Sequence, residues 1–182
     1  MSVQRIEAIG AVPRGAKVAN APDETIQLIT FDLDGEEYAV EILKVKEIVM
    51  MTKITRMPDC PDFIQGVVNL RGAVIPIIDM RKRFHLPKLD TTDATRIIIV
   101  DLARETIGMI VDRVNKVTKL PKNALNPPPP IFSGISSEYI SGIGNLEDRM
   151  LILLDLEKAF DAKEIDAIRT AAEPDPTMEW AA

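Results

Sequence analysis

The side chains best suited to catalysis are few in this sequence and stand apart from one another. His85 is the only histidine and Cys60 the only cysteine among 182 residues. A nucleophilic thiol needs a neighbouring base or cation, whereas Cys60 lies in the turn-forming run Asp59-Cys60-Pro61. No two histidines or cysteines have the spacing of metal ligands. The sequence therefore predicts no catalytic residue, no bound metal and no cofactor.

Glycine-rich and acidic motifs do not change this interpretation. Gly142-Ile143-Gly144 is followed by Asn145-Leu146 and an apolar strand, which is the wrong context for a dinucleotide-binding turn. The many carboxylates have no spacing that pairs them, and a solvated surface explains them. An enzyme that uses Cys60 or acidic residues remains a competing hypothesis, which alkylation of Cys60 would test.

Arg71 is the charged residue whose setting is most informative. It lies in Asn69-Leu70-Arg71-Gly72, where Asn and Gly favour a turn and the guanidinium offers a planar set of donors to a carboxylate or carbonyl. The residues alone are equally consistent with an arginine at the tip of a surface hairpin that binds nothing.

The turn containing Arg71 belongs to an internal repeat. Gly66-Val67-Val68-Asn69-Leu70 returns 76 residues later as Gly142-Ile143-Gly144-Asn145-Leu146, where Glu147 replaces Arg71. An earlier block returns after 69 residues, so that Asp32-Leu33 matches Asp101-Leu102. Two copies at so long a period indicate a duplicated β module rather than a solenoid. Two such modules packed together would create a seam between them.

The elements expected to position these residues are mostly short strands. Alternating or continuous apolar residues between turn signals predict strands over 26–33, 37–42, 72–78, 95–102, 139–143 and 149–154, and one or two more over 106–118. Residues 43–51 are ambiguous, because Val45, Ile48 and Val49 have helical spacing while the β-branched content favours a strand. Short helical turns are expected at 80–84 and 120–125, and a C-terminal helix begins after Asp161 as a candidate N-cap. This pattern is typical of a β-barrel class.

Composition limits the kinds of partner. The net charge of −6 and the pI near 4.9 disfavour nucleic acid or an anionic membrane as the main partner. No apolar run is long enough to cross a membrane, and the single cysteine fits a reducing compartment. Each repeat has about 60 residues, a size at which a separate core is marginal, so the halves are expected to share one core.

Six blocks of the sequence form an ordered series with characteristic spacing. They are Phe31-Asp32-Leu33-Asp34-Gly35-Glu36-Glu37-Tyr38, Ile42-Leu43-Lys44-Val45-Lys46-Glu47-Ile48, Phe63-Ile64-Gln65-Gly66-Val67-Val68-Asn69-Leu70-Arg71-Gly72, Ile75-Pro76-Ile77-Ile78-Asp79, Gly108-Met109-Ile110-Val111-Asp112 and Gly142-Ile143-Gly144-Asn145-Leu146. In order and spacing these blocks resemble the CheW-type chemotaxis coupling proteins, over about Ile26 to Phe160. The resemblance implies a mainly β fold of two SH3-like five-stranded β-barrels that share a core, with short helices and a C-terminal helix.

The resemblance also implies a function. It predicts a non-catalytic scaffold adaptor that couples chemoreceptor cytoplasmic tips to the regulatory domain of a CheA-type histidine kinase, without nucleic acid and without membrane insertion. Such a protein would be cytoplasmic and recruited to membrane-associated receptor arrays. The alternative is an adaptor of another chemosensory pathway such as twitching motility.

Binding residues carry over from the resemblance by position. Those implicated in receptor or kinase binding are Ile42, Val45, Glu47, Gly66, Arg71, Thr95, Val117 and Gly142. A groove that holds a helix needs an apolar stripe and a few charged anchors. Ile42, Val45 and Val117 could form the stripe, with Arg71 and Glu47 as the anchors. Arg96 follows Thr95 where some relatives have a small apolar residue.

The expected domain organisation follows from the repeat and the resemblance. Residues 1–25 form a flexible leader and 26–173 the CheW-like domain, with an acidic tail at 174–182. Within the domain, the first barrel is expected at about 26–92, the second at about 93–160 and the C-terminal helix at 161–173. The leader and the tail are expected to be mobile and dispensable for coupling. The leader has glycines and prolines without an apolar period, and the tail has Pro174 and Pro176 among acidic residues, so neither is expected to bury enough surface to offset the entropy of ordering.

Overall fold

The computed structural model describes residues 24–130 and 135–173, so the predictions made for the leader and the acidic tail lie outside the described residues. The strands are β1 (Thr25–Leu33), β2 (Glu36–Glu41), β3 (Val45–Met50), β4 (Ile64–Leu70), β5 (Ala73–Asp79), β6 (Arg96–Leu102), β7 (Glu105–Val111), β8 (Arg113–Pro121), β9 (Leu125–Asn126), β10 (Ile140–Leu146) and β11 (Arg149–Leu154). The α-helices are α2 (Met80–Arg83) and α3 (Ala162–Ala172), and the 3-10 helices are η2 (Ile42–Lys44), η3 (Lys122–Ala124) and η5 (Ile135–Tyr139).

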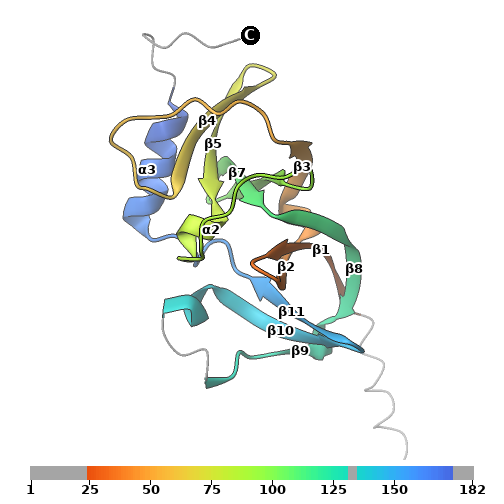
Figure 1. The fold of residues 1–182 in the computed structure, drawn as a ribbon. Helices are drawn as coiled ribbons and strands as arrows, with labels where there is room; N and C mark the ends of the chain where they lie inside the picture. The colour runs from red at the N-terminus through yellow and green to blue at the C-terminus, as the bar shows by residue number, and fades with distance from the viewer. Residues whose placement is uncertain (1–23, 131–134, 174–182) are drawn as a thin grey trace, which may run out of the picture.

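The strands form two sheets, and the mainly β fold predicted from the sequence is confirmed. One sheet has the order β8-β1-β2-β11-β10-β9 and the other the order β3-β6-β7-β5-β4. In Figure 1 the first sheet lies in the lower half of the molecule and the second in the upper half, with α3 alongside β4 and β5. The first sheet exceeds the expected five strands because the two-residue β9 pairs with β10.

The division of the strands between the sheets differs from the expected boundary near residue 92. Strands β1 and β2 join β8–β11, whereas β6 and β7 join β3–β5. Each sheet thus takes two strands from one sequence repeat and three or more from the other. Four pairings join strands of different repeats: the antiparallel pairs β1 with β8 and β3 with β6, and the parallel pairs that place Ala39 beside Leu153 and Gly108 beside Ile77. The barrels assigned to about 26–92 and about 93–160 are therefore corrected to two interleaved sets of strands.

The exchange preserves the symmetry of the repeat. The sheet order β3-β6-β7-β5-β4 becomes β8-β1-β2-β11-β10 when each strand is replaced by its counterpart in the other repeat. Even the irregularities agree, because one register shift lies between Ile64 and Gly66 and its counterpart between Ile140 and Gly142. The duplication seen in the sequence is a duplication of pairing geometry as well as of residue types.

Alternate faces of the strands fill three hydrophobic clusters. Leu28, Ala39, Leu120, Leu151 and Leu153 lie inside the first sheet, and Val68, Ile75, Ile77, Ile97 and Ile99 inside the second. A larger cluster takes side chains from both sheets, including Phe31 and Ile152 of the first and Ile98 and Met109 of the second. Strands buried on both faces explain the nearly continuous apolar runs in the sequence. The shared core expected from the small size of each repeat is present.

One charged network ties the two sheets at the seam. Arg81 of α2 donates from Nε and Nη2 to the Asp112 carboxylate at 2.8 and 2.7 Å, and that carboxylate accepts the Asp34 amide at 2.9 Å. Asp34 and Gly35 have φ of 52° and 83°, the conformation of the two-residue hairpin turn predicted for Asp34-Gly35. The Arg81 guanidinium holds the pKa of Asp112 below its usual range.

Helix α3 is fixed to the sheets by its N-terminus and by a buried arginine. Asp161 caps the helix, since its carboxylate accepts the Glu164 amide at 2.8 Å while Glu164 accepts the Asp161 amide. Arg83 lies over the rings of Phe63, Tyr139 and Phe160 and pairs with Glu164 at 3.2 Å. The cap predicted at Asp161 is confirmed, whereas the helix expected at 120–125 is only the three-residue η3.

Candidate interaction surface

Arg71 and Glu47 form an ion pair that joins a hairpin turn to an edge strand. The guanidinium donates from Nη1 to Oε1 at 2.6 Å and from Nη2 to Oε2 at 2.9 Å, so both carboxylate oxygens are held. The Arg71 side chain is 71% exposed and the Glu47 side chain 30% exposed, so the pair is accessible from solvent. The contact lowers the pKa of Glu47 and raises that of Arg71, because each stabilises the charged form of the other.

Local backbone geometry fixes the position of Arg71. Arg71 and Gly72 have φ of 54° and 87°, as a two-residue hairpin between β4 and β5 requires. The Asn69 side-chain oxygen accepts the Gly72 amide at 2.9 Å and stabilises the turn. The turn predicted at Asn69-Leu70-Arg71-Gly72 is present, and its arginine has an intramolecular partner.

Strand β3 presents apolar side chains beside this ion pair. Its residues alternate between half-buried and exposed; Val49 packs against the cluster inside the second sheet, whereas Val45, on the other side of a register shift, packs against the shared core. The exposed positions Ile48 and Met50 have surfaces that are 40% and 68% accessible. Leu43 of η2 is 90% exposed just before the strand. An edge strand that shows apolar residues to solvent is suited to contact a partner.

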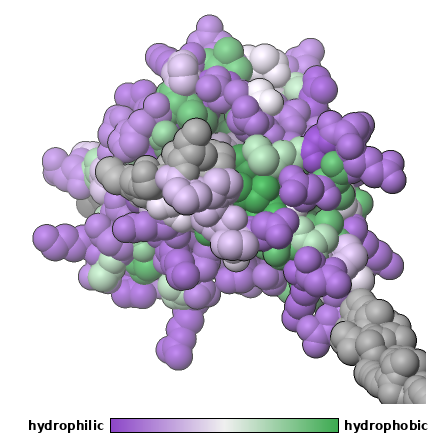
Figure 2. Space-filling view, turned by 90° about the horizontal axis from the view of Figure 1, so that it is seen from below, coloured by the Kyte–Doolittle hydropathy of each residue, from purple (hydrophilic) through white to green (hydrophobic). Residues whose placement is uncertain are grey.

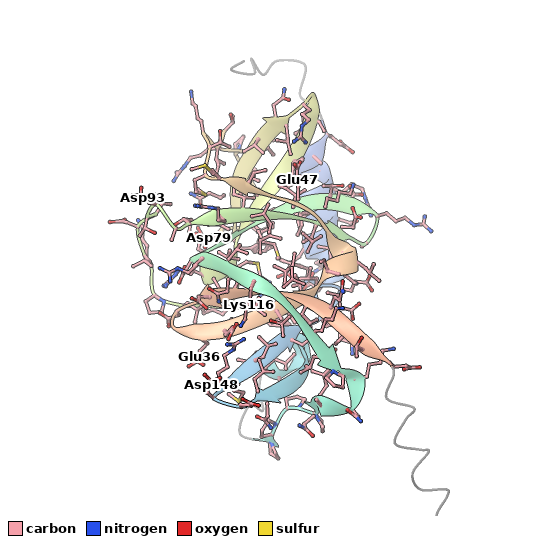
Figure 3. All side chains as sticks on the ribbon, turned by 90° about the vertical axis from the view of Figure 1, so that its right-hand side faces the viewer. Glu36, Glu47, Asp79, Asp93, Lys116 and Asp148 are labelled. Carbon is pink, nitrogen blue, oxygen red and sulfur yellow. The ribbon has the colours of Figure 1, made fainter. Side chains whose placement is uncertain are left out.

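Val117 of β8, in the other sheet, is the repeat counterpart of Ile48 of β3. Its surface is 53% exposed. Strands β3 and β8 are each the outermost strand of their sheet, and both lie on the right-hand side of Figure 1. Figure 3 looks at that side and shows Glu47 and Lys116 on the two strands. We call this face, defined by β3 and β8, the edge-strand face.

The remaining predicted binding residues are buried or half-buried. Thr95 is buried, and its hydroxyl accepts the Thr92 amide at 2.9 Å. Gly66 and Gly142 are buried at the two equivalent bulges. Ile42 and Val45 are half-buried, and Val45 packs against the shared core. The structure brings Glu47 and Arg71 into contact and leaves Val117 open on the edge-strand face.

The glycine at position 66 is required by the chain itself. Its φ is +150°, and a Cβ there would lie 2.1 Å from the Thr55 carbonyl oxygen and 2.8 Å from Ile54 Cγ2. The backbone that approaches Gly66 so closely belongs to the Thr55 segment of the same protein. At Gly142 the nearest atom, the Asn126 carbonyl oxygen, would be 3.3 Å from a Cβ.

Sequence reasoning did not select Leu43, Ile48 and Met50 as binding residues. The alternation over Val45–Met50 was the available signal, because alternate residues of an edge strand face outward. The signal could not be used without knowing that β3 is an edge strand.

Figure 2, which views the molecule from below, shows a largely polar face on which hydrophobic residues emerge in small separate areas.

Cys60 has surroundings that oppose nucleophilic chemistry. Its thiol donates to the Met57 carbonyl oxygen at 3.3 Å, and burial raises its pKa, which disfavours the thiolate. Among residues 24–130 and 135–173, no three His, Cys, Asp or Glu side chains gather as metal ligands. No helix in the same ranges is long and apolar enough to span a membrane.

Comparison with known proteins agrees with this architecture. The CheW-like domain family matches residues 27–164. The chain is 36% identical over 159 residues to the chemotaxis protein CheW of Klebsiella aerogenes, covering 86% of this chain and 96% of the relative. It is also 36% identical over 150 residues to the chemotaxis protein CheW of Treponema pallidum, covering 80% and 88%.

A solved structure has the same fold. The crystal structure of the scaffolding protein TtCheW from Thermoanaerobacter tengcongensis superposes with a TM-score of 0.72 at 35% identity, covering 78% of this chain and 96% of that one. The domain match extends from β1 into α3 and includes both edge strands and the turn with Arg71. The chain therefore belongs to the CheW family of chemotaxis scaffold proteins.

Proposed function

We propose that this protein couples the cytoplasmic tips of chemoreceptors to a CheA-type histidine kinase, as a non-catalytic adaptor within membrane-associated arrays. The observation that carries the proposal is the accessible Arg71–Glu47 pair beside the apolar residues of β3. A helical receptor tip would pack its apolar stripe on Ile48 and Met50 and take its register from the charged pair.

The kinase partner is supported by the family. The resemblance implies that the regulatory domain of the kinase has the same paired-barrel architecture and binds outer barrel faces. Two interleaved barrels provide two related but different surfaces, so one chain can contact a receptor and a kinase at the same time. A CheW-type adaptor of another chemosensory pathway would use the same surfaces with different partners.

A pull-down from the native cytoplasm tests the proposal. The affinity-tagged protein is expected to retain both a CheA-type kinase and chemoreceptors, and Arg71→Glu is expected to retain less of at least one of them. Lys163→Glu, at an exposed lysine of α3 that forms no ion pair with any described residue, is the matched surface-charge control. Recovery of neither partner by the wild-type protein would contradict the proposal.

The enzyme hypothesis makes a different prediction. If Cys60 were a nucleophile, alkylation of its thiol would abolish function, whereas an adaptor is expected to keep its binding of receptor and kinase after alkylation. The raised pKa of Cys60 and the hydrogen bond from its thiol to the Met57 carbonyl oxygen favour an adaptor that keeps its binding after alkylation.

A further inference from the structure

Three cations on β8 lack partners. Arg113, Lys116 and Lys119 are exposed, and their side chains make no hydrogen bond or ion pair with any other residue that the structure describes. At the end of the strand, Lys122 by contrast pairs with Glu24 at 3.4 Å. A row of unpaired cations is unexpected in a protein with a net charge of −6, because acidic groups to neutralise them are abundant. We call Arg113, Lys116 and Lys119 the β8 cations.

The repeat shows how β8 differs from β3. Lys116 occupies the position of Glu47, and Glu147 occupies the position of Arg71, so the two charges are exchanged. In the β3 sheet these positions form a bidentate ion pair, whereas Lys116 and Glu147 form none. The geometry that neutralises the charge on β3 is therefore absent on β8, and Lys116 remains free.

Lys116 and Val117 are exposed side by side on β8. The register between β1 and β8 shifts between Ile29 and Phe31, which face Val117 and Val114, and an equivalent shift lies between Val45 and Glu47 of β3. On β3 the ion pair with Arg71 leaves Glu47 half-buried, whereas on β8 consecutive residues, including Lys116 and Val117, are exposed. The apolar side chain of Val117 is thus flanked by cations.

The edge-strand face is consequently polarised. Its β3 side exposes the apolar residues Ile48 and Met50, whereas its β8 side exposes Val117 among the β8 cations. Figure 3 shows the two strands crossing the same side of the molecule, with Glu47 on one and Lys116 on the other. A partner that covers this face meets hydrophobic surface on one side and uncompensated positive charge on the other.

We propose that the β8 cations select a partner helix whose apolar stripe is flanked on one side by Asp or Glu residues, and that they fix which way this helix lies on the edge-strand face. The inference rests on the proposed function and specifies the chemistry of its receptor contact. Complementary charge at a contact determines specificity and orientation more than total affinity. The acidic flank would lie along β8 and the apolar stripe along β3.

A simpler role for the same cations makes a different prediction. Charged residues on an edge strand, lysine above all, prevent edge-to-edge association of sheets. Protection of the edge strand from association requires charge of either sign, so Glu at these positions would protect the edge as well as Lys. Reversal of the charge therefore separates selection of an acidic partner from protection of the edge.

The experiment measures binding of the full chain to a helical-hairpin fragment of a chemoreceptor from the same cell. The fragment is used in its native form and in a form whose tip Asp and Glu residues are replaced by Asn and Gln. The protein variants are Lys116→Glu/Lys119→Glu and the control Lys158→Glu/Lys163→Glu, which changes net charge equally at exposed lysines before and within α3, outside β3 and β8. Titration calorimetry at about 0.05 M and about 1 M salt completes the design, since the screening length at 1 M is about 3 Å.

The proposal predicts a loss of affinity on the order of tenfold for Lys116→Glu/Lys119→Glu with the native fragment at low salt. The loss should nearly disappear at high salt and with the neutralised fragment, and the control should bind like the wild-type protein. Size-exclusion chromatography should find the β8 variant as soluble and monodisperse as the wild-type protein.

Other results would overturn the proposal. Equal affinity of the wild-type protein and the β8 variant for the native fragment at low salt would show that the β8 cations do not contribute to recognition of the partner. A loss of the same size with the neutralised fragment would show that they act without an acidic flank. Failure of the wild-type protein to bind either fragment at either salt concentration would contradict the proposed function itself.

Discussion

Arg71 on the β4–β5 turn holds both carboxylate oxygens of Glu47 on β3, across 24 residues of sequence, while both side chains remain accessible to solvent. An exposed ion pair contributes little to folding, and we propose that this pair is a prearranged contact for a partner. Fixing the guanidinium before binding reduces the entropy that a partner must remove.

Arg71→Glu is expected to leave the fold intact and to weaken assembly with receptor and kinase. The substitution places two carboxylates together and removes the planar donor, but it does so at the surface. Thermal melting should stay close to that of the wild-type protein, while binding by the purified receptor and kinase falls on the order of tenfold or more. Melting and binding are measured on the same preparation.

The double variant Arg71→Glu/Glu47→Arg sharpens this test. It can restore the ion pair with its charges exchanged, but it presents the opposite charge at each position. We expect binding to remain weak, because the partner is expected to contact a positive charge at position 71. Full recovery of binding would mean that the pair matters only for shaping β3.

Gly66→Ala and Gly142→Ala are expected to have different costs although the two positions are equivalent in the repeat. The methyl group added at position 66 would clash with the Thr55 carbonyl in a backbone conformation that side chains rarely adopt, which should cost about 2–4 kcal/mol of unfolding free energy. The methyl group added at position 142 would meet its nearest atom at 3.3 Å and should cost less than about 1 kcal/mol. Urea denaturation measures both, and equal costs would show that Thr55 moves aside easily.

The carboxylate of Asp112 is expected to make stability depend on pH in the acid range. Its pKa is lower in the folded protein than in the unfolded chain, because Arg81 hydrogen-bonds the ionised form. Its contribution is therefore present above the unfolded pKa of about 3.9 and is lost as pH falls through the folded pKa. At pH 7 Asp112→Asn should lower the unfolding free energy by about 1–2 kcal/mol, discounted for partial exposure.

The difference between wild-type and Asp112→Asn proteins should begin to shrink below about pH 4, where Asp112 of the unfolded chain becomes protonated, and should vanish once pH falls through the lower pKa of the folded protein. Asp93→Asn is the control, because the Asp93 carboxylate has no hydrogen-bond or ion-pair partner among the described residues. A difference that stays constant between pH 7 and pH 3 would assign the effect to packing instead of charge.

The interleaved sheets predict that neither repeat folds alone. A fragment of residues 93–182 contains β8 and β11 but lacks β1 and β2, which lie between them in the sheet. It also lacks β3–β5, the other strands of the sheet that holds β6 and β7. Cooperative unfolding and dispersed amide resonances are not expected from 93–182 by itself. Mixing it with residues 1–92 should restore both, and a folded isolated fragment would contradict the exchange.

Most strands and turns were predicted because their signals are local, but β4 (Ile64–Leu70) and the two-residue β9 were missed. Asp34-Gly35 and Arg71-Gly72 adopt the positive φ values of two-residue hairpins, and Asp161 caps α3. The exchange of strands between repeats could not be predicted, since internal similarity identifies equivalent strands but does not say which copies pair. The parallel contacts of Ala39 with Leu153 and Gly108 with Ile77 are long-range choices made by the shared core.

The candidate site was predicted only in part, because contacts between residues far apart in the sequence depend on the whole fold. Arg71 and Glu47 were selected separately, and only the fold shows that the β4–β5 turn brings one onto the other. The binding roles expected for Thr95 and Gly66 remain predictions, but both residues are buried and have structural contacts of their own. Burial depends on which strands become sheet edges, and that is a property of the whole topology.

Reconstitution with purified components tests the coupling function most directly. Receptor-containing membranes, a CheA-type kinase and ATP are combined with and without this protein, and kinase autophosphorylation is measured together with co-sedimentation of the kinase. We expect that the kinase sediments with receptor membranes and changes its phosphorylation rate only when the protein is present, and that Arg71→Glu fails where Lys163→Glu succeeds. Kinase that neither sediments nor changes its rate on addition of the wild-type protein would contradict the coupling function.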